Sequence, residues 1–139
     1  MTEPRTNGKK KILLTGIKTT AEIPPFFRDQ FGTADEITAK LERDLARTQR
    51  NGFDCKPYQI DPNDAEVGLQ GMEDELKSSV YEGVMIGAGV RLVPEQTHLF
   101  EKMVDVCRRV APNIPFMFNS GPDTHCQALE RAFGIKMEE

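Results

Sequence analysis

Two short apolar runs constrain the fold of this chain more than any other feature. Residues 12–14 (Ile-Leu-Leu) and 84–86 (Val-Met-Ile) contain no polar side chain. A strand with one face in water alternates apolar and polar residues, so an uninterrupted run indicates a strand that is covered on both faces. We therefore predict that these two runs form the interior strands of a sheet.

Two further segments have the composition of strands, and each contains a proline. Residues 53–60 include Pro57, and residues 114–118 include Pro115. Proline cannot donate a backbone hydrogen bond to a neighbouring strand, so a strand that contains it belongs at a sheet edge. Numbering the four strands along the chain, we predict the spatial order 2-1-3-4.

A helical pattern follows each strand. The clearest spans residues 34–50, where Thr33 and Glu36 form a capping box and Asn51-Gly52 provides a stop. The helix over residues 64–79 is expected to be weaker, because it contains two glycines. The remaining two helices are predicted over residues 94–110 and in the segment that follows Asp123.

This alternation of strand and helix predicts a three-layer α/β/α sandwich with a four-stranded parallel sheet and right-handed crossovers. Residues 11–139 are expected to form one α/β domain, because a chain of 139 residues suits a single core. Residues 1–10 are polar after Met1 and are predicted to be a disordered arm.

The segment 18–32 is predicted to be a long loop, because it shows neither a helical nor a strand period. It contains Pro24-Pro25 and three of the eight phenylalanines, Phe26, Phe27 and Phe31. Connections of this length are often lids, binding loops or partner surfaces. The alternative, given equal weight, is that the phenylalanines cap one end of the core.

Composition excludes several classes of protein. The net charge of −4 argues against a nucleic-acid binder, which would carry a basic stripe. No apolar run approaches the ~20 residues that span a membrane, and no secretory leader is recognisable. The three cysteines have no paired spacing, so a reduced, cytoplasmic protein is expected. No metal-ligand spacing is present, and no motif identifies a cofactor.

In an open parallel sheet, ligands bind beyond the carboxyl ends of the strands where the strand order reverses, here between strands 1 and 3. Glycines, hydroxyls and two cations follow the strands that meet there, which suits a small polar or anionic ligand. The candidate ligand-binding residues are Thr15, Gly16, Lys18, Thr19, Gly87, Gly89, Arg91, Asn119 and Ser120. The alternative for Gly87 and Gly89 is that they only satisfy a turn that needs positive φ. The alternative for Arg91 is a surface or salt-bridge residue.

The candidate catalytic residues are His125, Asp61 and Asp123. His125 is the only imidazole predicted at this edge, and its near-neutral pKa suits acid–base chemistry. The alternative for His125 is an exposed residue of a first helical turn, and for Asp123 stabilisation of a helix dipole. Cys126 follows His125 directly and so points about 100° away on a helix, which predicts a core residue.

Two short stretches resemble known families. Residues 12–16 (ILLTG) resemble the opening of extended short-chain dehydrogenases, and residues 15–20 (TGIKTT) resemble flavodoxin phosphate loops. Both resemblances imply a Rossmann-like or flavodoxin-like sheet. The chain lacks the further glycines of the first family and the immediate helix of the second. It is therefore assigned to neither family, and its cofactor stays unknown.

The leading functional hypothesis is a domain that binds a small polar or anionic metabolite at the carboxyl edge. The residues are compatible with a plain binding protein and with an enzyme. The alternative hypothesis is a non-catalytic module that forms a homodimer through the phenylalanines of segment 18–32.

Overall fold

The computed structural model describes residues 9–138, in which four parallel strands form one sheet in the order β2-β1-β3-β4. The strands are β1 (Lys10–Ile17), β2 (Phe53–Ile60), β3 (Gly83–Ile86) and β4 (Phe116–Phe118). The predicted order is confirmed, and the two uninterrupted apolar runs lie inside. The predicted disorder of residues 1–8 lies outside the described residues, and Lys10, assigned to that arm, begins β1.

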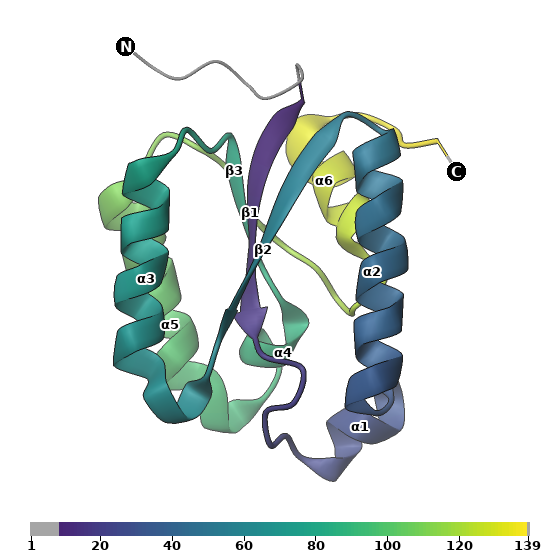
Figure 1. Ribbon diagram of the computed structural model, residues 1–139, viewed down its shortest axis with the longest axis vertical. Helices are drawn as coiled ribbons and strands as arrows, with labels where there is room; N and C mark the ends of the chain where they lie inside the picture. Colours follow the sequence, from purple (N-terminus) through teal and green to yellow (C-terminus); the bar gives the residue numbers. More distant parts are fainter. Residues whose placement is uncertain (1–8, 139) are drawn as a thin grey trace.

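Helices cover both faces of the sheet, which confirms the three-layer sandwich (Figure 1). Helices α2 (Ala34–Arg50) and α6 (His125–Phe133) cover one face, and α3 (Ala65–Ser78) and α5 (Thr97–Val110) cover the other. Successive residues of β1 point to opposite faces: Leu13 packs in the core beside α3 and α5, whereas Ile12 and Leu14 pack beside α2 and α6.

The helix ends follow the local signals in the sequence. The Thr33 hydroxyl accepts a hydrogen bond from the Glu36 amide, and the Glu36 carboxylate accepts one from the Thr33 amide. Gly134 ends α6 with φ 64°. Pro115 lies just outside β4 rather than within it, and its carbonyl accepts a hydrogen bond from the Val84 amide at 3.1 Å.

Two short helices correct the predictions for the loops. Segment 18–32 is not a loop throughout, because α1 (Pro25–Phe31) lies within it, and α4 (Ala88–Arg91) follows β3 directly. Helices of one or two turns contain too few residues to show a period. The suggestion that Gly87 and Gly89 meet a positive-φ turn is wrong, because Gly87 has φ −73° and Gly89 also stays outside that region.

The phenylalanines of α1 divide between core and solvent. Phe27 is buried with Ile37 and Val93 in a small cluster, and the partly buried Phe31 packs against that cluster. Phe26 is 50% exposed. Two of the three phenylalanines therefore cap the carboxyl end of the core.

Two of the predicted α-helices are each preceded by a short 3-10 turn, and the proline expected at the helix start lies in that turn instead. A 3-10 turn, Pro62–Asp64, precedes α3, and a second, Pro94–Gln96, precedes α5. Proline suits the first turn of a helix because its missing amide would have no partner there. The α-helices accordingly start later than the sequence predicts.

Gly68→Ala is expected to destabilise the protein by about 1 kcal/mol, although alanine favours a helix by a similar amount. A Cβ at position 68 would lie 2.5 Å from Cγ2 of Ile60, a branched side chain in the core that cannot move aside cheaply. Overpacking of this kind costs roughly 1–3 kcal/mol. Urea unfolding measures the difference, with the exposed Val67→Ala on the same helix as control. A stabilised Gly68→Ala would show that helix propensity outweighs the packing.

Candidate functional site

A cavity of about 90 Å³ lies at the carboxyl edge of the sheet, on the side of α2 and α6. One bound water needs roughly 10–15 Å³ on this scale, so the cavity has room for about six non-hydrogen atoms. It is bounded by the ends of β1 and β2 and by the connections that follow β3 and β4. The order of the strands reverses at the same place, between β1 and β3.

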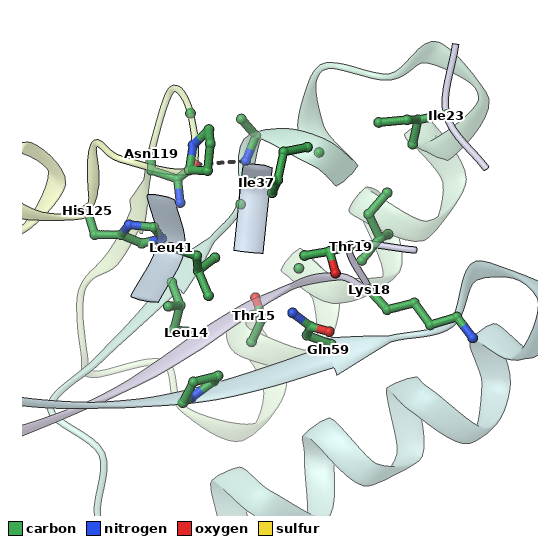
Figure 2. A pocket seen from close by; sticks show the side chains of 18 of the residues that line it. Leu14, Thr15, Lys18, Thr19, Ile23, Ile37, Leu41, Gln59, Asn119 and His125 are labelled. Carbon is green, nitrogen blue, oxygen red and sulfur yellow. Dashed lines mark hydrogen bonds between the residues drawn. The ribbon is translucent and has the colours of Figure 1, made fainter. Parts of the chain in front are cut away.

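The walls of the cavity are mainly apolar. Leu14 forms the floor, Ile37 and Leu41 come from α2, and Ile23 and Phe27 belong to the segment that contains α1 (Figure 2). The polar side chains among the lining residues are those of Thr15, Lys18, Thr19, Gln59, Asn119 and His125. An apolar pocket with a few polar groups is typical of small-molecule sites.

Most of the predicted site residues meet at this cavity. Those that line it are Thr15, Gly16, Lys18, Thr19, Gly87, Gly89, Asn119 and His125. Those outside its lining are Arg91, Ser120, Asp61 and Asp123. The exposed Ser120 donates its amide hydrogen to the Thr124 hydroxyl at 2.9 Å, and Asp123 is exposed two residues before α6 begins.

His125 is buried and paired with Asp44, an aspartate that is not among the predicted site residues. Its ring Nδ1 lies 2.8 Å from Oδ2 of Asp44, and its backbone amide donates to the same oxygen at 2.6 Å. The exposed fractions are 1% for His125 and 7% for Asp44. The alternative of an exposed first-turn histidine is therefore wrong, although His125 is the first residue of α6.

Asp44 occupies a position that the period of α2 assigns to the core. Ile37, Leu41, Asp44 and Thr48 follow each other at intervals of three or four residues, the spacing of a buried helix face. The sequence alone does not indicate a role for this aspartate, because charged residues usually lie at the surface. A carboxylate on an otherwise apolar stripe was the available signal that it has a buried partner.

Asn119 joins three of the segments around the cavity. Its Oδ1 accepts a hydrogen bond from the amide of Ala88 at 2.9 Å, which satisfies the first residue of α4. Its Nδ2 contacts only the Met85 sulfur at 3.8 Å, a weak interaction. The Gly87 amide donates to the Thr15 carbonyl at 2.9 Å, so β1, the start of α4 and the end of β4 are linked.

Gly87 permits this close approach. A Cβ at position 87 would lie 3.3 Å from the Thr15 carbonyl oxygen and 3.7 Å from Cα of Gly16. Both contacts are with backbone, which cannot move aside as a flexible side chain would. The glycine after β3 is therefore explained by its proximity to the backbone of β1, and not by a left-handed turn.

The two predicted cations are directed to other partners. Lys18 Nζ forms an ion pair with Asp61 Oδ2 at 3.0 Å, and in Figure 2 the lysine side chain extends away from Asn119 and His125. The Asn63 amide and then the Lys18 ammonium lower the pKa of the Asp61 carboxyl. Asp61 also caps the 3-10 turn before α3 by accepting from the Asn63 amide at 2.9 Å.

Arg91 supports the cavity from outside its lining. Its Nη2 donates to the backbone carbonyl of Asn119 at 3.0 Å, and its guanidinium lies over the Phe118 ring, 5.7 Å from the centroid. Its buried Nε has no hydrogen-bond partner among the described residues. The arginine therefore holds the end of β4, where Asn119 begins the connection to α6.

The cysteines are unpaired, and none of them lines the cavity. Burial, followed by the charge of Asp44, raises the pKa of the Cys126 thiol to about 12, which agrees with the predicted core position. Among residues 9–138, no group of three or more His, Cys, Asp or Glu side chains is arranged to hold a metal ion. None of the described helices combines the length and apolar character needed to cross a membrane.

Asp44→Asn is expected to have a lower free energy of unfolding than the wild type at neutral pH. The difference in free energy of unfolding between the two proteins is expected to become smaller in acid. Burial raises the pKa of the Asp44 carboxyl, but the hydrogen bonds from the His125 ring and amide outweigh it and leave the pKa below its ordinary value. A lowered pKa adds stability that is complete above the ordinary value of about 3.9 and is lost as the pH falls through the folded value. Urea unfolding between pH 7 and pH 3 measures both proteins. A difference that stays constant over this range would contradict the assignment.

No family model, no curated protein and no solved structure matches this chain. The fold and the cavity together define an open parallel α/β domain with a pocket where the strand order reverses. The function is therefore argued from the chemistry of the residues around that pocket.

Proposed function

We propose that the protein binds a small metabolite in the cavity at the carboxyl edge of its sheet. The observation that carries the proposal is an apolar cavity for about six non-hydrogen atoms, with the Asn119 amide and the His125 imidazole in its lining. Asn119 and His125 are 4% and 1% exposed, so their polar groups are kept from bulk water. Within residues 9–138, the Asn119 Nδ2 has only the weak contact with the Met85 sulfur, and a buried polar group without a strong partner favours a ligand that supplies one.

The wall chemistry favours a ligand with an apolar body and one hydrogen-bonding group. The predicted polar or anionic metabolite remains part of this proposal, with the polar group toward Asn119 and His125. A multiply charged anion is less favoured, because Lys18 is paired with Asp61 and Arg91 does not line the cavity. A neutral carbonyl or hydroxyl, or a single carboxylate, fits these groups better.

Amide NMR spectra recorded with four probes test the proposal: cyclopentanone, isobutyrate, 1,2-propanediol and inorganic phosphate. At about −0.7 kcal/mol per non-hydrogen atom, a six-atom ligand binds with a Kd of roughly 1 mM. We expect cyclopentanone and isobutyrate to shift the amide signals of Gly87, Ala88 and Asn119. If phosphate binds and cyclopentanone does not, the cavity is a simple anion site and the proposed ligand with an apolar body is wrong. The absence of shifts at the cavity with all four probes would overturn the proposal.

Leu41→Phe provides a blocking variant. Leu41 lines the cavity, and phenylalanine adds about three atoms to a space for about six. The matched control is Leu92→Phe, because Leu92 is 42% exposed and outside the lining. We expect the shifts to disappear in the first variant and to persist in the second. Shifts that survive Leu41→Phe would locate binding elsewhere on the protein.

A homodimer formed through α1 is the second candidate, and one observation favours it. Phe26 is 50% exposed, whereas Phe27 on the same helix is buried and Phe31 is partly buried. Light scattering after size-exclusion chromatography tests it: Phe26→Ser should yield a monomer, whereas the exposed control Val67→Ser should remain dimeric. Phe27 is unsuitable for this test because it belongs to the core. A monomeric wild-type protein would eliminate the dimer.

We also propose that the protein works in a reducing compartment such as the cytoplasm. Its three cysteines are free thiols, and two of them, Cys107 and Cys126, are buried in the core. Paired cysteines are the usual arrangement in oxidising compartments.

A further inference from the structure

The buried pair of Asp44 and His125 determines which nitrogen of the imidazole carries a proton. Asp44 Oδ2 lies 2.8 Å from Nδ1, and the carboxylate, whose pKa is lowered, can only accept at that oxygen. The ring must therefore donate from Nδ1. In the neutral imidazole, Nε2 then keeps its lone pair and can act as a base.

The basic nitrogen has no competing partner among residues 9–138. No hydrogen bond joins Nε2 to any of the described residues, and His125 is a lining residue of the cavity. The imidazole is 1% exposed, so bulk water has little access to it. A proton acceptor that is held at a fixed angle by a buried carboxylate meets the geometric requirement for a general base.

A hydrogen-bond donor lies beside this base. The bond from the Ala88 amide to Oδ1 fixes the orientation of the Asn119 side-chain amide. Among the described residues, its Nδ2 has only the weak contact with the Met85 sulfur at 3.8 Å, so this donor is not committed to a strong acceptor. In Figure 2, the Asn119 side chain and the His125 imidazole lie on the same side of the cavity, above Leu14 and Leu41. A preorganised amide donor of this kind can stabilise negative charge on an oxygen atom.

We propose that His125 and Asn119 form a catalytic pair that abstracts a proton from the carbon next to a carbonyl group of a small substrate. The inference rests on the proposed function, and it assigns the substrate class as small ketones, aldehydes or oxo acids. Nε2 of His125 takes the α-proton, and the electron pair of the broken C–H bond forms the carbon–carbon double bond of an enolate. The carbonyl π-pair moves onto oxygen, which accepts the hydrogen bond from Nδ2 of Asn119.

The step balances without an oxidant, a reductant or a second reactant. The imidazolium formed at His125 is stabilised by Asp44, and it can return its proton to the same carbon. With an enediolate, the hydroxyl proton first moves to the former carbonyl oxygen, and the imidazolium then protonates the former carbonyl carbon while the new carbonyl group forms at the other carbon. The first outcome is exchange of the α-proton when the Nε2 proton of the imidazolium is replaced by one from solvent before it is returned, and the second is an isomerisation of a hydroxy-carbonyl compound. Asp44 is a positioning residue, because it acts through the histidine and does not line the cavity.

Nucleophilic catalysis is less favoured by the same surroundings. No cysteine and no serine line the cavity, and the Thr15 hydroxyl donates to the Met85 carbonyl at 2.9 Å. The other lining hydroxyl, that of Thr19, accepts a hydrogen bond from the Thr38 hydroxyl at 3.1 Å and forms no hydrogen bond with His125. An activated nucleophile would need a hydroxyl or thiol within hydrogen-bond reach of Nε2. A purely structural pair, in which Asp44 only ties α2 to the first turn of α6, is the remaining alternative.

Exchange of the α-protons of cyclopentanone for deuterium tests the proposal by proton NMR in D₂O. We expect the wild-type protein to accelerate exchange over matched buffer and His125→Gln to lose about 100-fold of the protein-catalysed rate, since general bases contribute roughly 10²–10⁴-fold. Asn119→Ala should lose at least about 10-fold. The control is Glu42→Gln, an exposed position of α2 outside the cavity, which should exchange at the wild-type rate.

The outcomes separate this inference from the proposed function. Cyclopentanone that shifts the amide signals of Gly87 and Ala88 but exchanges no faster than in buffer would overturn the catalytic pair and leave the binding proposal standing. Absence of binding would overturn both. Wild-type exchange in a folded His125→Gln would exclude the histidine as the base.

A second measurement applies even if His125→Gln does not fold. Long-range proton–nitrogen correlations of the wild-type imidazole report which ring nitrogen is protonated. We expect a proton on Nδ1 and none on Nε2 in the neutral ring, with the Nε2 signal changing when isobutyrate or cyclopentanone binds. A neutral ring protonated at Nε2 would overturn the proposal, because that nitrogen could not accept the substrate proton.

Discussion

Asp44→Ala is expected to lower the free energy of unfolding by about 3 kcal/mol. The variant leaves two buried donors of His125, the ring Nδ1–H and the backbone amide, without the carboxylate oxygen that both share. A buried donor that loses its partner costs roughly 1–3 kcal/mol. Urea unfolding should show a midpoint lower by about 1–3 M, given an m-value of roughly 1–3 kcal/mol/M.

The matched control for Asp44→Ala is Glu42→Ala on the same helix. Glu42 is exposed two residues before Asp44, and surface substitutions usually change stability by less than about 0.5 kcal/mol. Asp44→Asn should fall between the two, because an amide oxygen can still accept one of the hydrogen bonds. Equal stabilities for Asp44→Ala and Glu42→Ala would show that the buried pair contributes nothing to folding.

Leu13→Ala is expected to cost about 2–5 kcal/mol, the range for truncating a buried leucine. Leu13 is 0% exposed at the centre of β1 and packs in the cluster formed with α3 and α5. Its neighbours come from several elements and cannot all collapse into the space that the substitution leaves. The free energy of unfolding in urea measures the loss.

Leu92→Ala is the matched control for Leu13→Ala, because it removes the same atoms from a side chain that is 42% exposed. We expect a loss of less than about 1 kcal/mol at that position. Similar losses for the two leucines would contradict the assignment of β1 to the interior of the sheet.

Much of the fold could be predicted from local patterns. The prolines at positions 57 and 115 indicated edge strands, and the uninterrupted runs indicated interior ones, which together gave the observed order of the sheet. The capping box at Thr33 and the stop at Gly134 likewise appear where the sequence predicts them. Each of these signals works within a few residues, because backbone hydrogen bonding and φ preference are local.

The candidate site was predicted in part. The sequence indicated the edge of the sheet and most of the residues that line the cavity, since the carboxyl ends of parallel strands always share one edge. It did not predict which side chains turn toward the cavity. Lys18 pairs with Asp61 and Arg91 donates to the Asn119 carbonyl, and both orientations depend on partners outside their own segments.

By itself, the sequence determined the strands, the order of the strands in the sheet and the principal helices. Hydrophobic periods and proline positions are local signals, because they depend on residues that are close together in the chain. Only the tertiary structure decided that Asp44 meets His125, 81 positions apart. That contact requires α2 and α6 to cover the same face of the sheet. Because α2 connects β1 to β2 and α6 follows β4, no single segment of the chain determines both positions. The same packing turned an aspartate on an apolar stripe into the buried partner of a histidine.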